Sequence, residues 1–385
     1  MSRTVCLTTE TLNYPQGGGH LWVSLNWALG LKALGCKVIW LEGFWAAEWA
    51  KDEASTTVAK QKIETLKRRL AHYGLVDGFG FFTWDGDGVP AAVRDGDLLL
   101  DDAAEADLLL DLSYGVPQTS VDRFRRSAVV DIDPGLLQVW LSTGVMRLSR
   151  YDLHFTIGET VGQPEARFPD CGITWHYTPP PVSLSAWPVA PASNGAPYTT
   201  VSGWWGDWVL FDGEMYPNGK RDSFQAYLEL PRRTPEQLEL ALCLTGGDDD
   251  LDEERRLLEA HGWRVTRAWE LTASPDDYRA YVQASRGEFS CVKPSCVRLQ
   301  NAWISDRTLC YLASGKPAVI QHTGPSRFLP DSAGLFRFHD PGEAVRCLEA
   351  VRSDYEHHCR LARQLAEQHF DAEQVVGSVL ERALS

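Results

Sequence analysis

Short apolar, strand-like runs alternate with helix-like segments along almost the whole of this 385-residue chain. The first run, residues 4–9, is followed by a glycine-rich turn at 16–20 and by apolar residues at helical spacing from 21 to 34. A strand, a helix and a second strand in this order form a βαβ unit, whose two strands lie parallel. The sequence therefore predicts an α/β fold with mainly parallel, doubly wound sheets.

A proline-rich stretch divides this alternation into two series. Six prolines fall within residues 178–200, and a regular helix or strand does not tolerate such a density. A second series of strands and helices follows it. We expect an N-terminal domain over 1–180, a linker over 181–197, a C-terminal domain over 198–352 and C-terminal helices over 353–385. Two such sheets that face each other create a cleft for ligands at the carboxyl ends of their strands.

The composition indicates which partners are excluded and which compartment to expect. The chain has 37 Lys and Arg against 52 Asp and Glu, a formal net charge of −15, so its surface repels nucleic acid and anionic lipid. No apolar run approaches the roughly 18 residues of a membrane-spanning helix, and the first residues lack a signal-peptide pattern. The nine cysteines contain no C-x-x-C pair, which favours free thiols in a reducing compartment. We expect a cytoplasmic protein without an integral membrane segment.

The glycine-rich turn is the first candidate site. A dinucleotide-binding fingerprint requires G-x-G-x-x-G, but Trp22 occupies the place of the third glycine, where it would block close packing of helix on strand. Glu42 does stand where a ribose-binding acid would lie. An NAD(P)-dependent oxidoreductase therefore stays open as an alternative function.

Residues 19–38 give a better match. They resemble the G-H-x-x-P-x-x-x-L-A-x-x-L-x-x-x-G-H-x-V pattern of inverting glycosyltransferases with the GT-B fold, with Val23 and Cys36 in place of the proline and the second histidine. The resemblance implies a Rossmann-like, acceptor-binding N-terminal domain, with the acceptor near Gly18, Gly19 and Trp22. It also implies that His20 is the general base that deprotonates the acceptor. The alternative is a histidine that only hydrogen-bonds the loop.

In that family an aspartate from a later strand holds the histidine. Such a carboxylate fixes the tautomer and stabilises the imidazolium as the proton arrives. Asp111, at the end of a buried strand, is the best candidate by position, followed by Asp131 and Asp133. Spacing alone does not choose among the three.

The second candidate site lies in the C-terminal half. Residues 287–290 and 303–317 resemble the nucleotide-sugar-binding segment of retaining GT-B enzymes, E-G-F-G followed by L-E-A-x-A-x-G-x-P. A helix that begins near Ser305 would point its free amides at a diphosphate, which Lys293 and Arg307 would neutralise. The predicted donor-binding residues of this segment are Glu288, Lys293, Ser305, Asp306, Arg307 and Gly324. Cys310 stands where the family has its ribose-binding glutamate.

A tryptophan-rich loop is the third candidate site. Residues 201–208 follow the first strand of the second half and contain three Trp within five residues. In GT-B enzymes this loop faces the cleft, so the resemblance implies that Gly203 and Trp204 contact the donor. Lys220, before the next helix, is a further candidate for phosphate binding. An exposed helix start would explain Lys220 equally well.

Acidic runs raise the question of a metal. Asp131 and Asp133 resemble the D-x-D of GT-A enzymes, which hold a divalent cation on the sugar diphosphate. Residues 85–88 and 248–250 are also rich in aspartate, but turns and helix N-caps account for them. A GT-A enzyme would not need a second doubly wound half, so we expect no metal site.

Together these observations predict a metal-independent glycosyltransferase with a GT-B fold, whose C-terminal helices cross back to the first domain. Its donor would be a nucleotide sugar such as a UDP-, dTDP- or GDP-sugar, and its acceptor a small molecule or glycan with a hydroxyl or amine. No cofactor is expected. A non-catalytic nucleotide-sugar binder is a second alternative function. The oligomeric state stays open, with a homodimer as one alternative.

Overall fold

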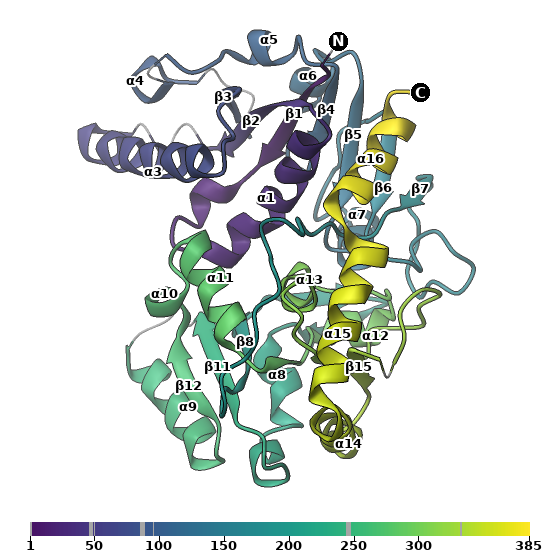
Figure 1. Cartoon of the computed structure of the whole chain (residues 1–385). Helices are drawn as coiled ribbons and strands as arrows, with labels where there is room; N and C mark the ends of the chain where they lie inside the picture. Colours follow the sequence, from purple (N-terminus) through teal and green to yellow (C-terminus); the bar gives the residue numbers. More distant parts are fainter. Residues whose placement is uncertain are drawn as a thin grey trace.

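The computed structural model describes residues 2–45, 49, 51–84, 89–94, 96–243, 248–331 and 333–385. Two parallel sheets, one from each half of the chain, lie at opposite ends of the molecule, with helices between and around them (Figure 1). This arrangement confirms the predicted fold class. Among the described residues, the parallel sheet of the N-terminal half has seven strands and that of the C-terminal half six.

The first sheet has the strand order β3-β2-β1-β4-β5-β6-β7, and every neighbouring pair is parallel. Its strands are β1 Thr4–Thr9, β2 Lys37–Phe44, β3 Gly78–Thr83, β4 Leu108–Asp111, β5 Ser127–Asp131, β6 Leu153–Thr156 and β7 Trp175–Tyr177. Its helices are η1 Thr11–Asn13, α1 Gly18–Ala33, α3 Glu53–His72, α4 Ala91–Arg94, α5 Leu100–Ala103, α6 Gln118–Val121 and α7 Leu136–Thr143. Strands β3 and β7 were not predicted, because β3 contains two glycines and β7 is only three residues long.

The second sheet repeats the design with the order β12-β11-β8-β13-β14-β15, again all parallel. Its strands are β8 Tyr198–Gly203, β11 Leu238–Cys243, β12 Arg264–Arg267, β13 Gly287–Ser290, β14 Ala318–Gln321 and β15 Leu335–Phe338. Its helices are α8 Lys220–Gln225, η2 Leu230–Arg232, α9 Asp248–Ala260, α10 Ala268–Leu271, α11 Pro275–Ala284, α12 Pro294–Leu299, α13 Asp306–Ala313 and α14 Pro341–Ser353.

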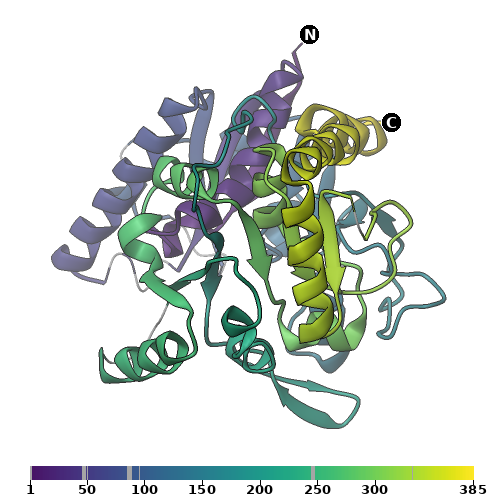
Figure 2. The same cartoon turned by 60° about the horizontal axis from the view of Figure 1, so that its bottom comes forward.

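The tryptophan-rich segment does not stay a loop. It leads into an antiparallel hairpin of β9 Trp208–Phe211 and β10 Glu214–Pro217, which projects from the second half in Figure 2. Asp212 and Gly213 form its turn with φ of 53° and 76°, and an Asp-Gly pair favours this two-residue turn.

The end of the chain returns to the first half. After α15 Tyr355–Leu365 and the short helix η3 Ala366–Phe370, α16 Ala372–Ala383 packs against α1 (Figure 1). Gly30 permits the close approach, since a Cβ there would lie 2.8 Å from the carbonyl oxygen of Ala372. The predicted crossing of the C-terminal helices is therefore confirmed.

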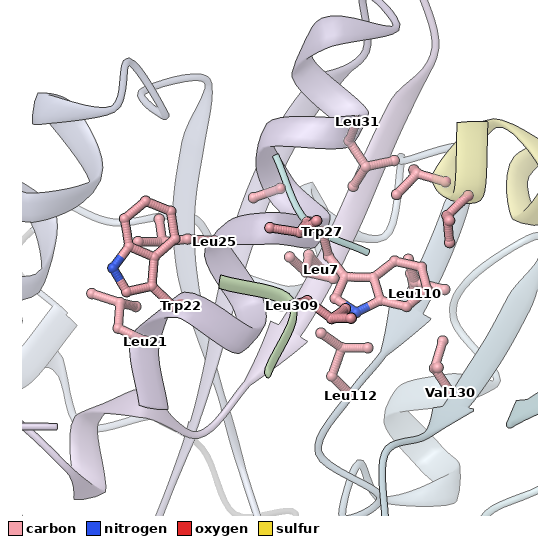
Figure 3. Close-up of a cluster of buried hydrophobic side chains, with 14 of the residues drawn as sticks. Leu7, Leu21, Trp22, Leu25, Trp27, Leu31, Leu110, Leu112, Val130 and Leu309 are labelled. Atoms are coloured by element: carbon pink, nitrogen blue, oxygen red, sulfur yellow. The ribbon is translucent and has the colours of Figure 1, made fainter. Parts of the chain in front are cut away.

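Helix α1 has no polar face because it is enclosed on nearly every side. Trp27, Leu25 and Leu31 pack against strand residues such as Leu7 and Leu110, and the cluster extends to Leu309 of α13 in the other half (Figure 3). The two halves thus share one hydrophobic core. This shared core fixes the relative position of the two sheets.

Candidate functional site: a cleft between the two sheets

A cleft of about 430 Å³ lies where the two halves meet. Its walls include Gly203 and Cys243, the last residues of β8 and β11, and Asp133, two residues beyond β5. Carboxyl ends of parallel strands are where ligands bind in such sheets. A larger groove of about 850 Å³ between the β6–β7 edge and α16 lies apart from these strand ends, and polar and apolar side chains line it in similar numbers. The smaller cleft, which gathers charged groups from both halves, is therefore the candidate site.

His20 enters the cleft from the first turn of α1. Its side chain is accessible from the cleft, and its ring lies 4.4 Å from the ring of Tyr14. The surrounding walls lower the pKa of His20 to about 4, because they deprive the imidazolium of water. His20 is therefore neutral at pH 7.

Asp111 does not meet His20. The carboxylate of Asp111 is buried and accepts hydrogen bonds from the Tyr151 hydroxyl at 2.5 Å and from the Ser113 amide at 2.8 Å. The Thr8 hydroxyl donates a third hydrogen bond. These contacts join neighbouring strands and leave Asp111 outside the cleft lining, so the predicted histidine–aspartate pair is not formed.

Of the other two candidate aspartates, Asp133 lines the cleft and Asp131 does not. The buried Asp131 accepts from Gln138 Nε2 at 2.9 Å and from the Thr156 hydroxyl at 2.8 Å. The two aspartates therefore do not present a shared pair of free carboxylates. Throughout the described ranges, His, Cys, Asp and Glu side chains form no group of three placed to hold a metal ion. Of the other acidic runs, residues 85–88 lie outside the described residues, and 248–250 begin α9.

The opposite wall of the cleft is cationic. Lys220, at the start of α8, and Lys293, just before α12, both line it, and neither forms an ion pair with another described residue. Burial, and to a lesser extent the nearby charges of Arg307 and Lys293, lower the pKa of Lys220 to about 7. An anion in the cleft would relieve both effects.

Arg307 lines the same wall but is already committed to protein acceptors. Its Nε donates to Glu288 at 2.7 Å, one Nη to the Ser290 hydroxyl at 2.6 Å and the other to the Val201 carbonyl at 3.1 Å. Both members of the Arg307–Glu288 pair are buried. Arg307 therefore ties α13 to β13 and β8, and Glu288 is its counter-ion rather than a group free to hold the donor.

The start of α13 faces the cleft, as predicted. The Ser305 hydroxyl caps the helix by accepting the Arg307 amide at 3.3 Å, and Ser305 and Asp306 both line the cleft. Burial raises the pKa of Asp306.

Three other predicted residues lie away from the cleft lining. Trp204 is buried and donates from Nε1 to Glu254 at 2.9 Å, and Trp22 is buried and donates to the Pro275 carbonyl at 2.8 Å. Gly324, with φ of 136°, packs against the carbonyl of Gln300. Trp204 serves the core of the second half, and Trp22 serves the contact between halves.

Gly18 and Gly19 line the cleft and also let α1 touch the second half. The Gly18 amide donates to the Thr272 carbonyl at 3.0 Å, and a Cβ at Gly18 would lie 2.2 Å from the carbonyl oxygen of Ser274. A Cβ at Gly19 would lie 2.6 Å from the ring of Tyr278. Their missing side chains are thus required by the contact between halves.

The sequence did not point to several lining residues, among them Tyr14, Cys243, Tyr278, Cys296 and Asn301. Tyr14 lies just before the glycine-rich turn, so the turn motif could have indicated it. Asn301 carries no local signal, since its role depends on a contact with the other half.

Solved structures share the architecture of this chain. No protein-family model matches the chain, and no curated protein sequence matches it. Anabaena Alr3699/HepE, solved with UDP and glucose, superposes with a TM-score of 0.55 at 12% identity, over 99% of each chain. Sucrose-phosphate synthase from Thermosynechococcus elongatus gives 0.55 at 9% identity, over 99% of this chain and 98% of that one. AviGT4, a glycosyltransferase of avilamycin A biosynthesis, gives 0.51 at 14% identity, over 99% of this chain and 97% of that one.

These similarities establish that the chain has the GT-B fold. Among the described residues no helix is long and apolar enough to cross a membrane.

Proposed function

We propose that this protein transfers a sugar from a nucleotide-diphosphate sugar to an acceptor hydroxyl or amine, without a metal ion. The observation that carries the proposal is the division of charge across the cleft. Lys220 and Lys293, without ion-pair partners among the described residues, stand on one wall, and neutral His20 stands on the other. Such a transfer requires cations for the departing diphosphate and a base for the acceptor.

On the donor side, the two lysines would neutralise the diphosphate at the start of α13. Gly203 would let the backbone approach the donor, because nothing lies within 4 Å of the position that its Cβ would take. Arg307 would shape this wall through its pair with Glu288. The structure of Alr3699/HepE with UDP-glucose supports a nucleotide sugar as the class of donor.

On the acceptor side, we propose that His20 takes the proton of the attacking group. A pKa of about 4 makes His20 a weak base. A bound diphosphate would place negative charge in the cleft and raise this pKa. His20 would therefore gain basicity only when the donor is present, which would limit unproductive donor hydrolysis.

Substitution of His20 tests the base role. His20→Ala should lower kcat by about 10²–10⁴, the usual contribution of a general base, and leave UDP binding unchanged because the lysines lie in the other half. His20→Gln keeps hydrogen bonding without basicity and should be equally impaired. The product sugar should have the inverted anomeric configuration by NMR.

The opposite result would give a clear answer as well. Nearly full activity of His20→Gln with a retained anomer would remove the base role and leave His20 to orient the acceptor. The leaving diphosphate would then accept the proton.

A further inference from the structure

Residues 300–302 form an unusual backbone segment at the cleft. Gln300 and Ala302, which are not glycines, both have left-handed backbone with φ of 53° and 54°. Side chains disfavour this conformation, which persists only where the surroundings impose it, often at functional sites. Between them lies Asn301, almost completely buried and part of the cleft lining.

Contacts from both halves hold this segment in place. The Ala302 amide donates to the Thr323 carbonyl at 2.9 Å, and Gly324 packs beneath, where a Cβ would lie 2.6 Å from the Gln300 carbonyl oxygen. From the first half, the Thr160 hydroxyl donates to that same carbonyl at 3.1 Å. Contacts within the second half therefore fix the strained backbone, and the first half adds one hydrogen bond to it.

The Asn301 side chain uses both of its ends. Its Oδ1 accepts the Trp303 amide at 3.1 Å within its own half. Its Nδ2 donates to the Pro134 carbonyl at 2.6 Å in the other half, next to Asp133. The left-handed backbone on either side of Asn301 thus aims one amide group across the boundary between the halves.

The segment that Asn301 reaches carries Asp133, whose backbone is well held: its amide donates to Asp131 Oδ1 and to the Tyr114 hydroxyl, both at 3.0 Å, and its carbonyl accepts from the Leu136 and Leu137 amides. Among the described residues, the Asp133 carboxylate itself has one long contact, of 3.5 Å, with Tyr114. The direction of this carboxylate therefore depends on the backbone of residues 133–135. Asn301 holds that backbone from the opposite wall.

We propose that Asn301, in the donor half of the molecule, is a positioning residue that fixes the orientation of the acceptor-side carboxylate of Asp133. The inference rests on the proposed function for its catalytic consequence. Asn301 and Lys293 flank the same short helix, α12, so the contact couples the wall that binds the diphosphate to the carboxylate on the acceptor side. The placement of Asp133 therefore depends on this contact between the halves.

Hydrogen exchange tests the contact without any assay of activity. Asn301→Asp keeps an acceptor for the Trp303 amide but cannot donate to Pro134, and Asn301→Ala removes both bonds. In the unliganded protein both variants should speed exchange in a peptide spanning 131–138 by about fivefold or more, because a lost tertiary bond lets the segment open. Tyr73→Phe is the matched control, since it removes a different bond between halves, from the Tyr73 hydroxyl to Asp276 at 3.0 Å. Equal exchange in wild type and both Asn301 variants would overturn the inference.

A double-mutant cycle with Asp133→Asn tests the catalytic role. Asn301→Asp should lower kcat/KM for the acceptor about tenfold or more, as displacement of a positioned group does, with UDP affinity unchanged within about twofold. In the Asp133→Asn background the same substitution should have almost no further effect, because both changes act through one group. Fully additive losses would contradict positioning through Asp133. If wild type releases no nucleotide from any nucleotide sugar, the proposed function fails, and the exchange measurement still decides the contact.

Discussion

Lys220 is a cleft residue whose charge changes near neutrality. Its pKa of about 7 lies below the ordinary lysine value because the ammonium is buried beside other cations. Only the protonated form attracts a diphosphate, so UDP affinity should fall as the pH rises above about 7. Below about pH 6 the terminal phosphate itself gains a proton, so affinity should fall there too. Calorimetric titration of UDP across pH 5–9 should therefore show a maximum between these limits.

Lys220→Arg provides the matched comparison. A guanidinium stays protonated over the whole range, so the decline of UDP affinity above pH 7 should flatten. An unchanged alkaline limb in this variant would show that another group controls it.

Arg307 belongs to the stability of the second half more than to its chemistry. Arg307→Ala would leave the Glu288 carboxylate buried without its counter-ion, and loss of one member of a buried pair costs about 3–5 kcal/mol. Urea unfolding should show this loss in the unliganded protein. Replacement of both members, Arg307→Met with Glu288→Gln, should recover much of it. A fully stable Arg307→Ala protein with weakened UDP binding would instead restore Arg307 as a phosphate ligand.

For single residues, the sequence predicted which side chains line the cleft better than it predicted which side chains are buried. His20, Lys293 and Ser305 reach the cleft because each stands next to the end of an element that the pattern located. Trp22 and Trp204 carry no sign in the sequence of being buried, since that depends on distant partners such as Pro275 and Glu254.

At the scale of elements, the start of α1 is where local sequence and tertiary contact meet. Gly18→Ala places a methyl group 2.2 Å from the Ser274 carbonyl oxygen, so the helix or its neighbour must move. Overpacking of this kind costs about 1–3 kcal/mol, and we expect a lower Tm together with a larger radius of gyration in solution scattering. Gly377→Ala in α16 meets nothing closer than 3.8 Å and should leave both quantities unchanged or raise Tm slightly. Identical behaviour of the two variants would contradict the close contact at Gly18.

Strand and helix periodicity predicted most of the long elements but not the short ones. β1 and α1 lie where expected, because buried strands of a parallel sheet read as apolar runs and α1 has apolar residues at helical spacing. The β9–β10 hairpin was missed because each strand has only four residues and buries just one of them. The Asp-Gly pair at its turn was the available signal.

At the scale of the whole molecule, the shared core explains why the cleft is a fixed feature. α1 and α13 pack together, and α16 returns to cover α1, so the two sheets are joined by more than the proline-rich segment. The sequence predicted the two facing halves, but it did not predict which carboxylate reaches the cleft. Asp111 and Asp133 both follow buried strands, and only the loop geometry after β5 brings Asp133 forward.

The central claim is that this cleft binds a nucleotide diphosphate through Lys220 and Lys293, which have no ion-pair partner in the described part of the chain. Calorimetric titration of wild type and of the Lys220→Ala, Lys293→Ala double variant with UDP, dTDP, GDP and NADP tests it directly. We predict that at least one diphosphate binds wild type and competes with its nucleotide sugar. The double variant should lose about 3 kcal/mol or more of this affinity, since hydrogen bonds to charged groups contribute about 1.5–3 kcal/mol each. Equal diphosphate binding by both proteins, or binding of NADP alone, would contradict the account.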